Sequence, residues 1–207
     1  MRIGVIGAGS LGVALAAKLA DAGHELMFGG AASAQEAAGA LGVEAGTNKQ
    51  AAVFGDVVVL AVPFDAIDSA LRDAGGLDGK VLWSCVNALL PDLAGLAVGF
   101  DNSAAEEVAK RAPGARVVAA IPPFAEALAS GDLAYDGGLP PSVFLCGDDH
   151  ESKSVVDQLV IGLGAHSVDA GPLQAARFVE PAMMLLVALA YAGLPRDVGL
   201  RLLERAS

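Results

Sequence analysis

Residues 7–12 read Gly-Ala-Gly-Ser-Leu-Gly, a glycine spacing of the form G-x-G-x-x-G. A short apolar run, residues 2–6, precedes this motif, and an alanine-rich helical pattern over residues 10–22 begins within it. The order predicts a buried strand, a tight turn and a helix, which together open a βαβ unit. The same spacing would be weak support for a site anywhere else in a chain. Here it predicts an α/β fold whose first turn approaches a ligand closely.

The three glycines have different roles in such a turn. Gly7 permits the tight bend, Gly9 leaves room for a pyrophosphate, and Gly12 lets the helix pack closely on the strand. The N–H groups near Ser10 and Leu11 then face the phosphates, where the helix dipole favours negative charge. We therefore expect these five residues to bind a dinucleotide without a nearby lysine.

A second diagnostic position follows the second predicted strand, residues 25–28. An acid there favours NAD, and a basic residue favours NADP. This chain has Gly29-Gly30-Ala31-Ala32, which offers neither. The backbone amides of Gly29, Gly30 and Ala31 can form an anion nest, and no carboxylate is expected to repel a 2′-phosphate. The sequence favours NADP as cofactor and leaves NAD open.

Strand and helix patterns alternate over residues 1–170. The predicted strands cover residues 2–6, 25–28, 56–62, 80–86, 116–121, 142–146 and 166–169. The predicted helices cover residues 10–22, 33–41, 49–54, 65–73, 103–112 and 149–163. Most strands are unbroken apolar runs, as is typical of parallel strands covered on both faces. The pattern predicts a doubly wound, mostly parallel sheet of the Rossmann type.

Residues 171–207 lose this alternation. Helical patterns run from Leu173 to about Tyr191 and again from Pro195 to Glu204. We expect a small helical extension that acts as a cap or as a dimerisation segment. Arg177 and Glu180 form either a surface pair or contacts with the pocket, and the sequence leaves both open.

Ligands of such sheets bind at the carboxyl ends of the strands. The predicted cofactor-binding residues at these ends are Val62, Pro63, Asn87, Ile121 and Pro122. The prolines also have the simpler interpretation that they end strands. We expect neither a catalytic side chain nor a metal site, since the acids at 148–151 suit a helix start.

The charge balance narrows the class of partner. The chain has 13 Lys and Arg against 24 Asp and Glu, a net charge of −11, which disfavours nucleic acid and anionic membranes. The uncharged run 181–194 is shorter than the roughly 20 residues of a membrane span. Cys85 and Cys146 lie in apolar runs and are interpreted as reduced thiols of a cytoplasmic protein.

With these features, the sequence resembles the NADPH:F420 oxidoreductase family over nearly the whole chain. The matching segments are GAGSLGVALAAKLADAGHEL (7–26), DVVVLAVPFDAI (56–67), LLPDLAGLAVGF (89–100), SAAEEVAKRAPGARVV (103–118), FLCGDDHES (144–152) and DAGPLQAARFVEP (169–181). The resemblance implies a Rossmann domain with a small C-terminal part. It also implies hydride transfer between the nicotinamide of NADP(H) and the deazaflavin coenzyme F420, often in a homodimer.

Two segments depart from the family pattern. Relatives often have a Ser-Arg-Arg type turn after the second strand, where this chain has Gly30, Ala31 and Ala32. Many also have a Lys-Ala-Phe-Asn-like stretch where this chain has Ala119-Ala120-Ile121-Pro122-Pro123. Two alternatives therefore stay open. One is an NADP(H)-dependent reductase of another acceptor, such as an imine, a flavin or a metal chelate, and the other is a non-catalytic dinucleotide-binding module.

Overall fold

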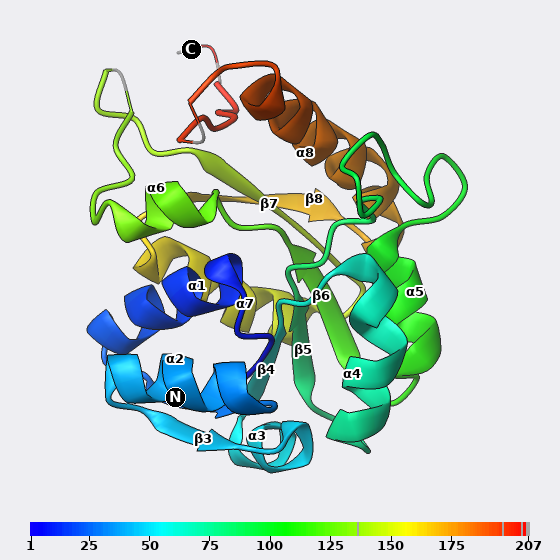
Figure 1. Ribbon diagram of the computed structural model, residues 1–207. Coiled ribbons are helices and arrows are strands. Elements are labelled where there is room, and N and C mark those ends of the chain that lie inside the picture. Colours follow the sequence, from blue (N-terminus) through cyan, green and yellow to red (C-terminus); the bar gives the residue numbers. More distant parts are fainter. Residues whose placement is uncertain (136, 196, 204, 206–207) are drawn as a thin grey trace.

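The computed structural model describes residues 1–135, 137–195, 197–203 and 205. Their strands form one sheet in the order β3-β2-β1-β4-β5-β6-β7-β8 (Figure 1). The strands are β1 Arg2–Ile6, β2 Glu25–Gly29, β3 Glu44–Gly46, β4 Val57–Leu60, β5 Val81–Ser84, β6 Arg116–Ala120, β7 Ser142–Gly147 and β8 His166–Gly171. Every neighbouring pair is parallel except β6 and β7. The predicted doubly wound, mostly parallel sheet is confirmed.

Helices cover both faces of the sheet. They are α1 Ser10–Asp21, α2 Ala32–Leu41, α3 Asn48–Phe54, α4 Ile67–Ala74, α5 Ala104–Arg111, α6 Ala125–Ala129, α7 His150–Gly162 and α8 Ala176–Tyr191. One apolar cluster joins the sheet to α1, α2, α6 and α7, and a second joins it to α3, α4, α5 and the start of α8. The buried strands therefore read as continuous apolar runs because neither face meets water.

Side-chain caps fix where several helices begin. The Thr47 side chain accepts a hydrogen bond from the N–H of Gln50, whose own side chain accepts one from the N–H of Thr47. Ser103 caps α5 in the same way through the N–H of Glu106, and Asp149 caps α7. Each cap satisfies an N–H that has no acceptor within the helix, so local sequence sets these boundaries.

The structure contains two elements that the sequence patterns did not predict. Strand β3 is only three residues long and contains no apolar run, and α6 follows a proline-rich turn. The helix predicted over residues 195–204 is wrong for its described residues, while 196 and 204 lie outside them. There the chain bonds to β7 instead: Ser142 donates its N–H to the carbonyl of Leu200, and Leu202 donates its N–H to the Ser142 hydroxyl.

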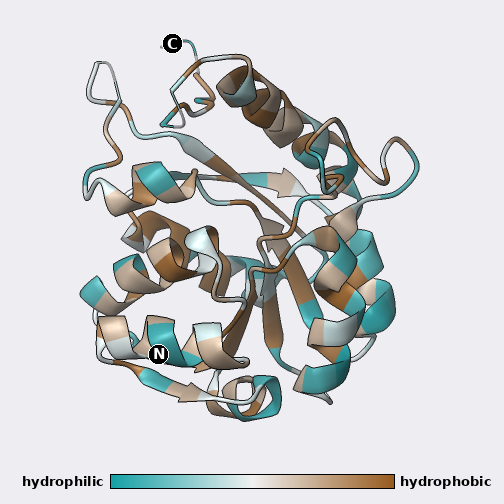
Figure 2. Ribbon diagram, in the orientation of Figure 1, coloured by the Kyte–Doolittle hydropathy of each residue, from teal (hydrophilic) through white to brown (hydrophobic). Residues whose placement is uncertain are grey.

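Helix α8 lies against the edge of the molecule with one face buried and one face exposed (Figure 1). Ala176, Glu180, Leu186 and Ala190 are buried, while the exposed apolar side chains are Phe178, Leu185, Leu189 and Tyr191. Figure 2 shows the apolar colouring that runs along this helix. By length and composition alone, Leu173–Tyr191 is long and apolar enough to cross a membrane. A third of that segment is buried inside the protein, and it includes the buried carboxyl of Glu180.

Candidate functional site

The glycine loop joins β1 to α1 and has two kinds of glycine. Gly7 has φ +114°, and a Cβ built there would lie 2.2 Å from the carbonyl oxygen of Ala61. A Cβ built on Gly12 would lie 2.0 Å from the carbonyl oxygen of Gly7. Gly9 differs from both, because a Cβ there would meet no described atom within 4 Å. The fold itself requires Gly7 and Gly12, whereas the surface at Gly9 is open to a ligand.

The start of α1 is free to bind an anion. Gly9 occupies the N-cap position and provides no side-chain cap, and its carbonyl accepts the N–H of Val13 at 3.0 Å. The N–H groups of Ser10, Leu11 and Gly12 therefore have no acceptor within the helix. With the helix dipole behind them, these groups form a cradle that fits a diphosphate.

A cavity of about 430 Å³ lies beside this loop, at the ends of β1 and β2. The predicted residues Gly7, Gly29, Gly30, Ala31 and Val62 line it. Its remaining lining residues are Ile6, Ala8, Ser33, Ala34, Asn48, Ala66, Ser69, Ala70 and Asp73. We call it the nucleotide cavity, because it lies where a Rossmann fold places the adenosine half of a dinucleotide.

Polar groups of this cavity come from helices that the sequence patterns did not connect to it. Asp73 adds a carboxylate that the sequence patterns did not connect with this cavity, since α4 brings it into the lining. Asn48 contributes an amide whose Oδ1 is buried without a hydrogen-bond partner among the described residues. No Lys or Arg belongs to the described lining. The cavity is thus polar but has no cationic side chain.

A larger cavity of about 640 Å³ opens on the other side of the loop. The predicted residues Gly9, Ser10, Leu11, Val62, Pro63, Asn87, Ile121 and Pro122 all line it. Val62 lines both cavities, and Gly12 lines neither because it packs behind Gly7. We call the larger space the ring cavity, since its walls are almost entirely apolar.

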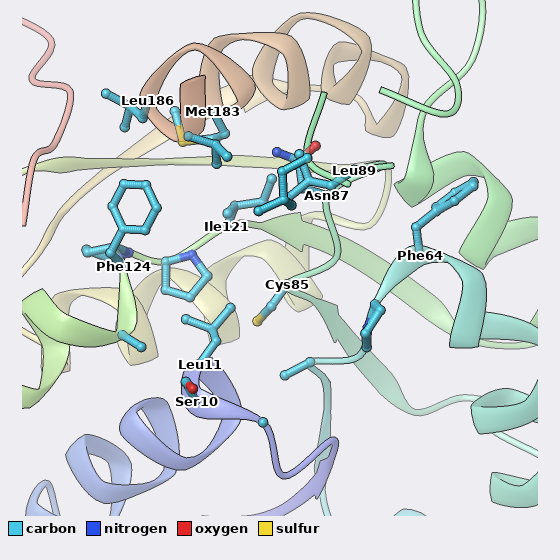
Figure 3. A pocket seen from close by; sticks show the side chains of 18 of the residues that line it. Ser10, Leu11, Phe64, Cys85, Asn87, Leu89, Ile121, Phe124, Met183 and Leu186 are labelled. Carbon is cyan, nitrogen blue, oxygen red and sulfur yellow. The ribbon is translucent and has the colours of Figure 1, made fainter. Parts of the chain in front are cut away.

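Figure 3 shows how separate elements build the ring cavity. Leu11 projects from the start of α1, Cys85 from the end of β5, and Met183 and Leu186 from α8. Phe124 faces them from the turn before α6. The sequence patterns missed this C-terminal wall, because α8 and residues 198–200 reach the cavity only through tertiary packing.

The chemistry of the ring cavity is that of an apolar slot. Its charged lining residues in the described chain are two acids, Asp65 and Glu126. Burial raises the pKa of the Cys85 thiol, so the sulfur is neutral and not a thiolate nucleophile. The cavity can accept a flat apolar ring and keep water away from it.

Comparison with known proteins gives a consistent family. A family model described as NADP oxidoreductase, coenzyme F420-dependent, matches residues 2–88. An F420-dependent NADP reductase of Methanothermobacter thermautotrophicus is 31% identical, and the alignment covers 98% of this chain and 94% of that protein. Its counterpart in Methanothermobacter marburgensis is 30% identical, with 98% of each chain covered.

A solved structure from Arthrobacter sp. FB24, provisionally described as an F420-dependent NADP reductase, has the same fold. It aligns with a TM-score of 0.87 and 25% identity, and covers 99% of this chain and 100% of that one. The alignments with the two reductases and with this structure span 98–99% of the chain, whereas the family model ends at residue 88. From its sequence and its fold, the chain belongs to the family of coenzyme F420-dependent NADP oxidoreductases.

Proposed function

We propose that this protein transfers a hydride between NADP(H) and the deazaflavin coenzyme F420. The observation that supports this most directly is the open surface at Gly9, in the lining of the ring cavity, together with Val62, which lines both cavities. A dinucleotide laid over this surface has its adenosine half in the nucleotide cavity and its nicotinamide in the ring cavity. The remaining apolar space then accepts the second ring.

The residues around the ring cavity act by placement and by exclusion of water. Hydride transfer between two flat rings needs parallel stacking at contact distance, and the cofactors themselves supply the redox chemistry. Leu11, Ile121, Phe124 and Met183 form apolar walls that hold flat rings. In this proposal no side chain acts as an acid or base in the transfer.

The 2′-phosphate of NADP is held here by groups other than arginine. Helix α2 has no side-chain cap at Ala31, so the N–H groups of Ala32 and Ser33 have no acceptor within the helix, whereas that of Ala34 donates to the carbonyl of Ala31. The Ser33 hydroxyl and the Asn48 amide belong to the same cavity. These neutral donors support NADP binding and replace the Ser-Arg-Arg type turn expected from the family.

An anaerobic assay tests the proposal. Purified protein with NADPH and oxidised F420 is expected to bleach the deazaflavin absorbance. Folded protein that binds NADPH but leaves F420 unchanged contradicts the assignment, and parallel assays with an imine, a flavin and a ferric chelate then identify the acceptor. Binding without turnover of any of these supports a non-catalytic module.

We also propose that the protein is a cytoplasmic homodimer whose interface includes α8. Phe178 and Leu185 on its outer face are 77% and 54% exposed, and large exposed apolar surfaces commonly mark interfaces. In this proposal residues 171–207 have two functions, since the inner face of α8 lines the ring cavity. The free, buried thiols of Cys85 and Cys146 support a reducing compartment.

A further inference from the structure

Glu180 is a buried carboxylate that joins two helices. It lies on α8 and is only 2% exposed. Its Oε2 accepts the N–H of Ala104 at 2.8 Å, and its Oε1 accepts the N–H of Ala105 at 3.0 Å. Both donors belong to the first turn of α5, where the helix dipole favours a negative charge. The carboxylate therefore acts as a second cap on α5, supplied by a distant part of the chain.

The same residue also holds a wall of the ring cavity. Its main-chain carbonyl accepts the Nδ2–H of Asn87 at 3.3 Å, and the N–H of Ala88 interacts with its carboxylate. Asn87 lines the ring cavity, and so does Met183, one helical turn after Glu180. Figure 3 shows Asn87 and Met183 on this side of the cavity, below α8. One residue thus fixes the segment after β5 and the helix that faces it.

We propose that Glu180 is a positioning residue for the ring cavity. Its side chain seats α8 on α5, and its main chain holds Asn87, so together they set the width of the slot for the second ring. The proposal rests on the proposed function of that cavity. It assigns Glu180 no contact with either substrate.

A buried carboxylate at the contact between α8 and α5 has a large desolvation cost. Burial alone disfavours the charged form, and apolar residues of similar size often pack as well as a buried charge. The charged groups nearest to it add no compensating cation: Glu106 of α5 repels it, and Arg177 makes two hydrogen bonds to Glu106 instead. The Cys146 thiol of β7 is the other titratable neighbour. The main-chain N–H groups therefore supply the stabilisation, and they fix direction more strictly than apolar packing does.

Ligand titrations test the proposal with a matched control. Glu180→Ala is expected to weaken binding of oxidised F420 about tenfold, as for loss of a buried hydrogen-bonded group, and to change NADPH affinity less than about twofold. Glu180→Gln keeps the shape of the side chain and one acceptor oxygen. Its affinity for F420 is therefore expected to lie between those of Glu180→Ala and the wild type. Arg177→Ala breaks a different contact between α8 and α5, the pair with Glu106, and is expected to leave F420 affinity near that of the wild type. Equal effects on both ligands, no effect, or an equal effect of Arg177→Ala overturns the inference.

Asn87→Ala provides a second route if Glu180→Ala does not fold. It removes the hydrogen bond from Asn87 to the main-chain carbonyl of Glu180, and the same selective weakening of F420 binding is expected. Unchanged F420 affinity contradicts the inference.

Amide hydrogen exchange separates this inference from the proposed function. Faster exchange at Ala104, Ala105 and residues 87–89 in Glu180→Gln supports the positioning role even if the wild type binds no F420, a result that would overturn the proposed function alone. Unchanged exchange at these amides overturns the positioning role.

Discussion

The first and last glycines of the loop are in direct contact, because a Cβ on Gly12 would lie 2.0 Å from the carbonyl oxygen of Gly7. Gly12→Ala must therefore displace β1 or α1. We expect it to lower the free energy of unfolding by about 2 kcal/mol, the usual cost of overpacking. Urea denaturation monitored by circular dichroism measures this loss.

Gly9 provides the opposite case, since a Cβ there meets open space. Gly9→Ala is expected to leave stability within about 0.5 kcal/mol and to weaken NADPH binding roughly tenfold, because only the ligand opposes the methyl group. Gly9→Asp adds bulk and charge at the diphosphate and is expected to abolish binding. Calorimetric titration of NADPH gives both values. Retained affinity in Gly9→Asp would show that the loop is not the dinucleotide site.

Asp73 places a carboxylate in the nucleotide cavity, which we propose as the site of the 2′-phosphate. We expect Asp73→Asn to raise NADPH affinity about threefold and to leave NADH affinity unchanged. The substitution removes the repulsion between the carboxylate and the 2′-phosphate, which water and salt already weaken. Asp68→Asn is the matched control, since Asp68 lies on the same helix and pairs with Arg111. An equal change for NADPH and NADH would argue that Asp73 contacts the part common to both nucleotides.

Glu180 gives the folded protein a distinctive dependence on pH. Burial raises the pKa of its carboxyl from 4.5 to about 7, and the N–H groups of Ala104 and Ala105 offset only part of that effect. The folded state therefore binds this proton more tightly than the unfolded state does. Its contribution to stability is complete below about pH 4.5 and is lost as the pH rises through about 7, a change of about 3 kcal/mol.

Glu180→Gln removes this titration. Urea unfolding of both proteins between about pH 5 and pH 8 is expected to show the variant gaining stability relative to the wild type as the pH rises. A difference that is constant with pH would mean that the carboxyl has an ordinary pKa in the folded protein.

The exposed face of α8 gives the prediction for assembly. Leu185→Glu places a charge at the centre of the proposed interface and is expected to convert a dimer to monomer in sedimentation equilibrium, with the fold retained. Val53→Glu is the control, because Val53 is 68% exposed on α3, far along the chain from this face. A wild-type protein that sediments as a monomer contradicts the homodimer.

Local sequence patterns were sufficient to predict most of the strands of the sheet and the glycine loop after β1. Runs such as residues 56–62 identified buried parallel strands, and the spacing of Gly7, Gly9 and Gly12 located the turn between β1 and α1. The family resemblance is confirmed by the comparisons, whereas the roles of the predicted site residues stay predictions. These features were accessible because strand burial and backbone approach leave a signature within a few residues.

The remainder depended on contacts between distant segments. Asp73 shares a cavity with Gly30 only because β1 and β4 are neighbours in the sheet, and the buried position of Glu180 depends on where α5 begins. Residues 197–203 show the same limitation, since their helical pattern gave way to hydrogen bonds with Ser142. The residue pattern within one segment does not show which distant segment it will contact in the folded protein.

Val62 is the one described residue that lines both cavities, so almost every other substitution in the lining affects one cavity alone. The described residues that line the nucleotide cavity all fall within residues 6–73. The ring cavity differs, since α8 and residues 198–200 form part of its wall. A substitution in α8 or in residues 198–200 therefore alters the wall of the ring cavity and leaves the lining of the nucleotide cavity as it is.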